Sequence, residues 1–252
     1  MIQLRSRRDL LKALSAGLVV GACSENPATG RRQLSLVSDE ALAALGQEAW
    51  ADALARMPKV NDRAMQARLE RIGEAVAAQS RAQTAAWEFA VFDSADINAF
   101  VLPGGKVGFF RGLIESAQSD DEIAAVMGHE IGHIEARHSN ERMSQQLALQ
   151  IGVSLAAAAM SEEYGQNAEA IASALGAGVL YGVILPYSRL QELEADRLGL
   201  GLMRAARFDP EGALSFWRRM AGDGGEALEW MSTHPADTRR LEALAALVGQ
   251  SR

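Results

Sequence analysis

Two histidines stand four residues apart in this sequence, with a glutamate directly after the first of them. If this segment is helical, His129 and His133 lie on one face with their Cβ atoms roughly 5–6 Å apart. Two imidazoles at that spacing can bind one zinc ion at Zn–N distances of about 2.0–2.1 Å. Glu130 is rotated by about 100° around the helix, where its carboxylate is expected to act as a general base toward a water molecule. The pattern is typical of a hydrolytic zinc site.

A hydrolytic zinc site needs a third protein ligand, and a later segment offers a carboxylate. Glu192 and Asp196 are four residues apart in a pattern that predicts a helix, so they share a face. Glu192 can complete a ligand set of two histidines and one glutamate, and Asp196 can accept the free ring N–H of His129. The alternative is a solvated acidic face paired with Arg189 and Arg197, which composition alone favours.

Two other titratable residues near the motif, His138 and Glu194, are given no chemical role. A site whose third ligand is a histidine six residues after His133 is excluded, because position 139 is serine. His138 would lie about 140° around a continuous helix from His133, so we expect a structural hydrogen-bonding residue. Glu194 is expected to point away from the zinc and into solvent.

The zinc motif is predicted to lie on a well-specified helix. Residues 119–122 read as a capping box, and apolar residues follow at helical spacing into the motif. Two further helices are predicted over residues 38–57 and 61–76. Residues 87–111 have the alternating pattern of β-strands around a Pro-Gly turn, which predicts a β-hairpin beside the motif helix. The expected fold class is α+β and predominantly helical, a zincin-like domain.

The composition of the 252-residue chain favours one core-forming domain behind a leader. Hydrophobic residues make up 48% of the chain, which is enough for a full core. The formal net charge is −7, and loss of residues 1–22, with four positive groups and one negative, would leave −10. An acidic chain binds nucleic acid poorly, so that class of function is excluded. The single cysteine, Cys23, excludes an intrachain disulfide and a cysteine-rich zinc site.

The N-terminus has the pattern of an export signal over residues 1–22. Arg7 and Arg8 precede an apolar stretch shorter than the ~20 residues of a membrane-spanning helix. The arginine pair is similar to a twin-arginine signal, with the general secretory route as the alternative. The residues up to Cys23 resemble a lipoprotein cleavage box, which implies a lipidated Cys23 and a tether over residues 23–37. We therefore expect a lipid-anchored periplasmic protein on the inner face of the outer membrane.

Residues 38–252 are predicted to form one metallopeptidase domain. Within it, two Ala/Gly-rich apolar runs cover Leu147–Met160 and Ala168–Leu185. We interpret them as buried helices packed through small residues, with a membrane-dipping hairpin as the alternative. The first run is too short to span a bilayer.

Together these segments resemble one family of gluzincin peptidases, whose signature is HExxH followed by ExxAD. This family includes the CAAX prenyl endopeptidase, HtpX, BepA and LoiP, and the short lipoprotein members without C-terminal TPR repeats are the most similar. The residues that carry the resemblance are His129–His138, Ser188–Arg189, Glu192–Asp196, and the segments 26–31, 98–113 and 233–235.

The resemblance implies a zinc endopeptidase with one Zn²⁺ per chain. Glu192 would be the third ligand, Glu130 the general base and Asp196 the partner of a ligand histidine. His234 matches a histidine that can approach the zinc, as a fourth ligand at rest or as a transition-state donor; a surface turn is the alternative. Arg240 is expected to support the oxyanion or the site.

The expected substrate is an extended polypeptide that adds a strand at the edge formed by Asn98, Ala99 and Phe100. Folded proteins rarely offer an extended segment, so misfolded or unassembled envelope and outer-membrane proteins are the expected targets. The alternative is a chaperone-like binding protein that assists outer-membrane protein assembly with a normally closed zinc site. The expected partners are polypeptides, the membrane through the lipid anchor and the outer-membrane assembly machinery, with no nucleic acid.

Overall fold

The computed structural model describes residues 23–82, 86–164, 187–222, 234 and 238–249. The chain divides into two compact units, which are described separately. One unit comprises residues 1–38 and 140–183, and the other comprises residues 39–139 and 184–252. The predicted export signal, residues 1–22, and the second apolar run, Ala168–Leu185, lie outside the described residues.

In the first unit, the segment expected to be a polar tether is structured. Strands β1 (Cys23–Glu25) and β2 (Arg32–Leu34) pair in antiparallel register, with Ser24 opposite Gln33. The turn between them forms because Asn26 Oδ1 accepts hydrogen bonds from the backbone N–H groups of Ala28 and Thr29. The same segment binds helix α6 (His138–Tyr164), where Arg31 donates two hydrogen bonds of 2.6 and 2.7 Å to Glu141. The prediction of a simple tether missed these local and long-range contacts.

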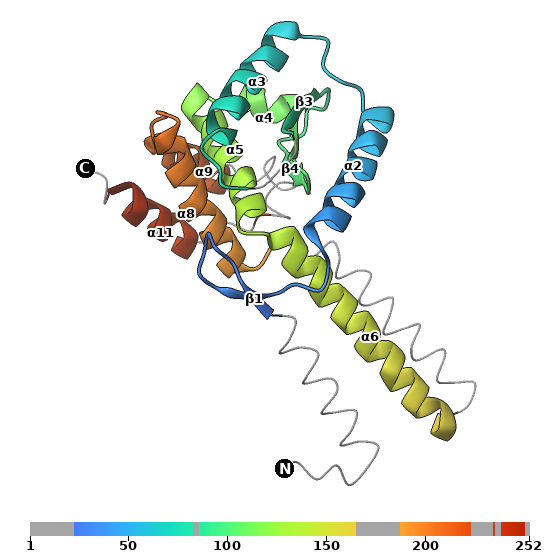
Figure 1. Cartoon of the computed structure of the whole chain (residues 1–252). Helices are drawn as coiled ribbons and strands as arrows, with labels where there is room; N and C mark the ends of the chain where they lie inside the picture. The colour runs from blue at the N-terminus through green and yellow to red at the C-terminus, as the bar shows by residue number, and fades with distance from the viewer. Residues whose placement is uncertain (1–22, 83–85, 165–186, 223–233, 235–237, 250–252) are drawn as a thin grey trace. The chain divides into compact units, whose positions relative to one another are not determined.

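The second unit contains a three-stranded mixed sheet (Figure 1). Strands β3 (Glu88–Phe92) and β4 (Ala99–Leu102) both pair with β5 (Lys106–Phe110), the first parallel and the second antiparallel. The predicted hairpin is therefore confirmed. Its turn, Pro103–Gly105, needs glycine because Gly104 and Gly105 have φ angles of 83° and 78°. The order β3–β5–β4 places β4 at one edge of the sheet.

The sheet separates two apolar clusters, because alternate residues of a strand face opposite sides. Ala99 and Val101 of β4 join the main core, whereas Phe100 packs with Trp50 and Phe92 in a smaller cluster. Trp50 belongs to helix α2 (Asp39–Arg56) and makes an edge-on contact with Phe92 at 5.8 Å between ring centroids. The remaining helices of this unit are α3 (Arg63–Ala77), α4 (Arg111–Ser116), α5 (Asp120–Glu135), α8 (Arg189–Ala205), α9 (Glu211–Gly222) and α11 (Thr238–Gly249). The described structure is predominantly helical with small sheets, as predicted.

Helix α5 carries the zinc motif and is almost wholly buried. Ser119 caps it by accepting a hydrogen bond from the backbone N–H of Glu122, which is half of the predicted capping box. The Glu122 carboxylate does not complete the box. It accepts a hydrogen bond from the Gln118 backbone and pairs with Arg219 of α9, which fixes the start of α5 in the core.

Among the described segments, no helix combines the length and apolar character that crossing a membrane requires.

Candidate metal centre

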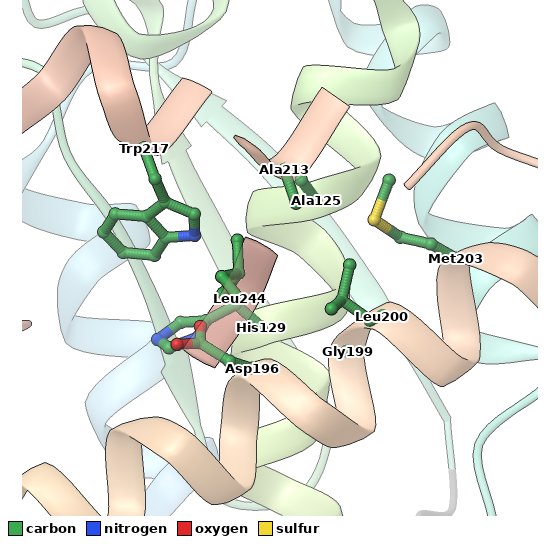
Figure 2. Close-up of a pocket in the computed structure, with 9 residues that line it drawn as sticks. All are labelled: Ala125, His129, Asp196, Gly199, Leu200, Met203, Ala213, Trp217 and Leu244. Carbon is green, nitrogen blue, oxygen red and sulfur yellow. The ribbon is translucent and has the colours of Figure 1, made fainter. Parts of the chain in front are cut away.

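Helices α5 and α8 approach closely enough for their backbones to touch, and this contact builds the site. A Cβ added to Gly132 would lie 2.6 Å from the carbonyl oxygen of Ala195, a distance that no real side chain tolerates. Figure 2 shows the two helices face to face, with His129 on α5 and Asp196 on α8 at the wall of a small pocket. The close approach brings polar side chains of the two helices, such as His129 and Asp196, within hydrogen-bonding distance of each other.

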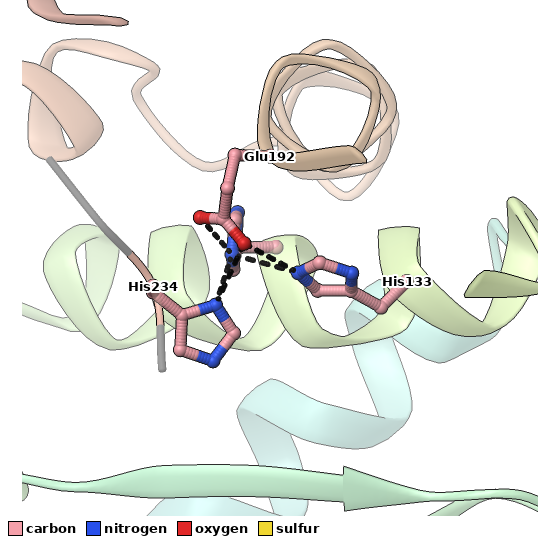
Figure 3. A group of neighbouring side chains, drawn as sticks. His133, Glu192 and His234 are labelled. Carbon is pink, nitrogen blue, oxygen red and sulfur yellow. Dashed lines mark hydrogen bonds and ion pairs between the residues drawn. The ribbon is translucent and has the colours of Figure 1, made fainter. Parts of the chain in front are cut away.

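Four buried side chains converge between these helices: His129, His133, Glu192 and His234 (Figure 3). Nε2 of His129 lies 3.1 Å from Nε2 of His133 and 3.1 Å from Nδ1 of His234. Oε1 of Glu192 lies 3.1 Å from His234 Nδ1 and 3.5 Å from His133 Nε2. The structure thus brings together every residue predicted as a ligand, and a fourth candidate with them.

The spacing of these atoms fits one metal ion. Four donors at about 2.05 Å from a tetrahedral centre lie about 3.3 Å from one another. Four of the six separations between these donors run from 3.1 to 3.5 Å, and all four donor atoms lie within 4.8 Å of one another. Without a cation, several lone pairs would face each other in a dry site, which is unfavourable. Imidazole and carboxylate donors are those that suit zinc.

Glu130 lies beside the cluster rather than in it. Its side chain is buried, and its Oε1 accepts no hydrogen bond from any described residue. Nε2 of His234 lies 3.5 Å from that oxygen. A buried carboxylate oxygen without a donor is unfavourable unless another group, such as a water or a substrate, supplies one.

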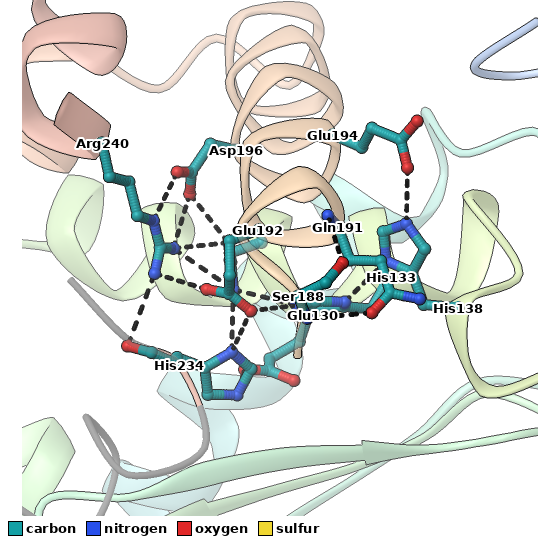
Figure 4. Close-up of polar contacts among 11 residues, drawn as sticks. Glu130, His133, His138, Ser188, Gln191, Glu192, Glu194, Asp196, His234 and Arg240 are labelled. Carbon is teal, nitrogen blue, oxygen red and sulfur yellow. Dashed lines mark hydrogen bonds and ion pairs between the residues drawn. The ribbon is translucent and has the colours of Figure 1, made fainter. Parts of the chain in front are cut away.

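Asp196 and Arg240 hold His129 in place. Asp196 Oδ1 lies 2.9 Å from His129 Nδ1, which directs His129 Nε2 toward the other donors. Arg240 donates two hydrogen bonds to Asp196, at 2.6 and 2.8 Å, and forms an ion pair with Glu192 (Figure 4). The guanidinium lies 3.8 Å above the ring of Trp217, which also contacts His129 edge-on. Arg240 thus supports the site from behind the two carboxylates.

The charges of this cluster shift several pKa values. Burial raises the pKa of Glu192, but attraction to His129 and hydrogen bonds to His133 and His234 hold it well below its ordinary range. Burial also raises the pKa of Asp196, and the Arg240 guanidinium more than offsets this effect. Burial lowers the pKa of His133 well below its ordinary value. The carboxylates are therefore ionised and His133 is neutral, the states that metal binding requires.

His138 and Glu194 are closer to the site than their spacing suggested. His138 Nδ1 lies 2.8 Å from His133 Nδ1, and His138 Nε2 lies 3.0 Å from Glu194 Oε2. The prediction that Glu194 points into solvent is wrong. The helical angle used for His138 did not apply, because α5 ends at Glu135 and Arg137 takes a φ of 54°. The chain turns there and returns His138 toward the motif.

The remaining predicted residues lie on separate elements. Asn98 directly precedes the edge strand β4, and Ala99 and Phe100 belong to it. Cys23, the single cysteine of the chain, is in β1.

Sequence patterns missed Trp217 and Tyr187, whose rings cover the site. Tyr187 stacks on His133 at 3.9 Å between centroids with 27° between the ring planes. Its position directly before the Ser188 cap of α8 was a usable signal, because a residue at that point is held against the helix start.

Comparison with known sequences identifies relatives over most of the chain. The family described as Peptidase family M48 matches residues 63–248. Mitochondrial metalloendopeptidase OMA1 of Schizosaccharomyces pombe is 34% identical over 226 residues, 86% of this chain and 64% of the relative. OMA1 of Arabidopsis thaliana is 33% identical over 74% of this chain and 36% of its own length. The beta-barrel assembly-enhancing protease of Yersinia pestis is 27% identical over 74% of this chain and 40% of its own length.

These relatives correct the expected location. Five relatives with identities of 32–38% are named as mitochondrial proteins, and they overturn the expectation of a lipid-anchored periplasmic protein at the outer membrane. The reasoning failed because a short basic and apolar N-terminus is a pattern shared by several kinds of targeting segment. The chain spans about one third to two thirds of the length of the OMA1 relatives.

Proposed function

This chain belongs to peptidase family M48, and from that premise we propose that it is a zinc-dependent endopeptidase that cleaves extended segments of non-native polypeptides. The observation that carries the proposal is the convergence of four buried donor atoms, all within 4.8 Å of one another, beside the unpaired carboxylate oxygen of Glu130. In this proposal His129, His133 and Glu192 hold the metal.

A bound zinc ion would lower the pKa of a water molecule to about 7 and polarise a carbonyl group. Glu130 has the place and the free oxygen to take the proton of the attacking water and to pass it to the leaving amine. Asp196 and Arg240 keep the Nε2 lone pair of His129 directed at the metal. Arg240 also balances the charge of Glu192.

The polypeptide substrate is proposed to add a strand to β4. This strand lies at the edge of its sheet, so one row of its backbone groups has no partner within the sheet. Recognition through the backbone selects extended chains rather than particular sequences. The name of the Yersinia pestis relative, a beta-barrel assembly-enhancing protease, supports a narrower proposal, that unassembled membrane β-barrel proteins are among the substrates.

A second function is favoured by the position of His234. Its Nδ1 lies 3.1 Å from both His129 Nε2 and Glu192 Oε1, so it takes the fourth donor position, which a catalytic zinc site keeps open. A protein whose site stays closed would bind non-native chains without cutting them. This alternative is a chaperone-like binding protein that assists membrane-protein assembly.

The test compares Glu130→Gln with Glu74→Gln, an exposed glutamate on α3. We expect Glu130→Gln to keep one zinc per chain, measured by atomic emission, and to lose cleavage of an unfolded reporter protein by a factor of about 10²–10⁴. Glu74→Gln should match the wild type in both. Cleavage by Glu130→Gln at the wild-type rate would refute the mechanism. If the wild type itself binds the reporter and never cleaves it, the binding function is correct instead.

A further inference from the structure

We propose that His138 and Glu194 are positioning residues, which fix the tautomer of His133 so that its Nε2 lone pair faces the metal. This role presupposes the metal centre of the proposed function and adds two residues to it. Figure 4 shows the three side chains in one line, from His133 on α5 through His138 at the start of α6 to Glu194 on α8.

The direction of the hydrogen bonds in this line follows from its last member. In this proposal Glu194 is ionised and His138 is neutral. An ionised carboxylate only accepts hydrogen bonds, so His138 Nε2, 3.0 Å from Glu194 Oε2, carries a proton and donates it. A neutral His138 then has its lone pair on Nδ1. The Nδ1 atoms of His138 and His133 are 2.8 Å apart, and therefore His133 must be the donor. With its proton on Nδ1, His133 presents a lone pair at Nε2.

The burial of these three side chains supports this direction of the hydrogen bonds. His133 and His138 are both fully buried, and the Glu194 side chain is 11% exposed. Water does not compete for a buried ring nitrogen, so each one needs a protein partner. The Tyr187 ring stacks on His133, and its centroid lies 6.2 Å from that of the His138 ring at a tilt of 50°.

The backbone before His138 turns so that this residue comes back to the motif helix. Arg137 has a φ of 54°, a conformation that is unfavourable for a residue with a Cβ atom. This residue ends α5 and returns the chain so that the next side chain contacts His133.

The two motif histidines are thereby supported in different ways. His129 reaches a carboxylate directly, since its Nδ1 lies 2.9 Å from Asp196. His133 reaches a carboxylate through one intervening imidazole. Asp196 and Glu194 are two residues apart on α8 and so point about 200° apart around the helix, one toward each histidine. A single helix thus orients both nitrogen ligands, and its Glu192 supplies the oxygen ligand.

The test reads the tautomer directly. Two-bond ¹H–¹⁵N correlation spectra of the ¹⁵N-labelled, metal-free protein at about pH 8 show which ring nitrogen of each histidine is protonated. We expect the His133 proton on Nδ1 in the wild type. In Glu194→Gln the amide can donate to His138 Nε2 and reverse the line, so a population with the His133 proton on Nε2 should appear. The control is Glu242→Gln, the same change at an exposed position on α11.

Zinc affinity, measured by chelator competition, is the second readout. We expect Glu194→Gln to bind zinc about 10–100-fold more weakly, with an unchanged melting temperature of the metal-free protein, and Glu242→Gln to bind like the wild type. A wild-type His133 protonated on Nε2 would overturn the inference, and this measurement needs no variant and no metal. If Glu194→Gln leaves both the His133 tautomer and the zinc affinity unchanged, the inference is also overturned. The same holds if its loss of zinc affinity is fully explained by a lower melting temperature of the metal-free protein. A wild type that binds no zinc but holds the Nδ1 proton would refute the metal centre alone.

Discussion

Gly128 on α5 and Gly199 on α8 lie in direct backbone contact where the two helices cross. A Cβ added to Gly128 would meet the Gly199 carbonyl oxygen at 2.8 Å, and a Cβ added to Gly199 would meet the Gly128 carbonyl carbon and the His129 nitrogen at 2.7 Å. All of these neighbours are backbone atoms, which cannot rotate away. The distance between the helices, and with it the distance from His129 to Asp196, is therefore set by the absence of two side chains.

Gly199→Ala should separate the helices and weaken both folding and metal binding. Overpacking of this kind costs about 1–3 kcal/mol of unfolding free energy, and the displaced Asp196 would no longer reach His129. The matched control is Gly201→Ala on the same helix, which is exposed and has nothing within 4 Å of an added Cβ. That change should raise stability by up to about 1 kcal/mol, because alanine is the better helix former. Urea unfolding and zinc titration measure both effects, and equal behaviour of the two variants would contradict this account.

The sequence was sufficient to predict features that depend on local chemistry. The Ser119 cap, the helix that carries His129 and His133, and the hairpin around Gly104 all follow from spacing over a few residues. The carboxylate of Glu192 could be placed because a helical repeat puts it on one face with Asp196.

Features that depend on tertiary packing were missed or mistaken. His138 was assigned an angle on a continuous helix, but the positive φ of Arg137 ends that helix. No local pattern places Trp217 over Arg240, since the two lie on α9 and α11. The Glu122 carboxylate was expected to close a capping box, yet Arg219 lies within reach and forms the stronger, charge-assisted pair.

The pair of Glu122 and Arg219 should make stability depend on pH. Burial raises the pKa of Glu122, but hydrogen bonds from Arg219, Gln118 and Ser215 lower it overall from 4.5. The folded protein therefore binds this proton more weakly than the unfolded chain, so the carboxylate contributes stability above about pH 4.5, and this contribution is lost as the pH falls through the lower folded pKa.

We expect Glu122→Gln to lose about 1.5–3 kcal/mol of unfolding free energy near pH 7, the usual contribution of hydrogen bonds to a charged group. The difference from the wild type should shrink as the pH falls below about 4.5. Glu115→Gln is the control, because its pairing with Arg111 is exposed and should change stability by less than about 0.5 kcal/mol. A Glu122→Gln deficit of the same size at every pH would show that the contribution is steric.

His234→Ala tests whether the fourth donor closes the site. Three donors remain in this variant, so zinc should stay bound. If His234 holds the closed state by about 1.4 kcal/mol, its removal should raise the rate of reporter cleavage about tenfold. The double variant with Glu130→Gln should be inactive, which separates true turnover from contamination. A lower rate in His234→Ala would instead assign His234 as a transition-state donor through its Nε2, which lies 3.5 Å from Glu130.

Val101→Pro tests the free edge of β4. The backbone N–H of Phe110 donates to the carbonyl of Asn98 at 2.9 Å, and bonded pairs alternate along an antiparallel ladder. Phe100 and Leu102 therefore bond to β5, whereas the backbone groups of Ala99 and Val101 point away from the sheet. Proline at position 101 removes an outward N–H and no bond to β5, which an edge strand tolerates.

We expect Val101→Pro to lower kcat/KM for an unfolded protein about tenfold, the effect of losing one hydrogen bond of about 1.4 kcal/mol, with zinc content unchanged. Val101→Ala, which removes side-chain volume but keeps the N–H, should retain kcat/KM; equal losses in both variants would exclude strand addition at this edge.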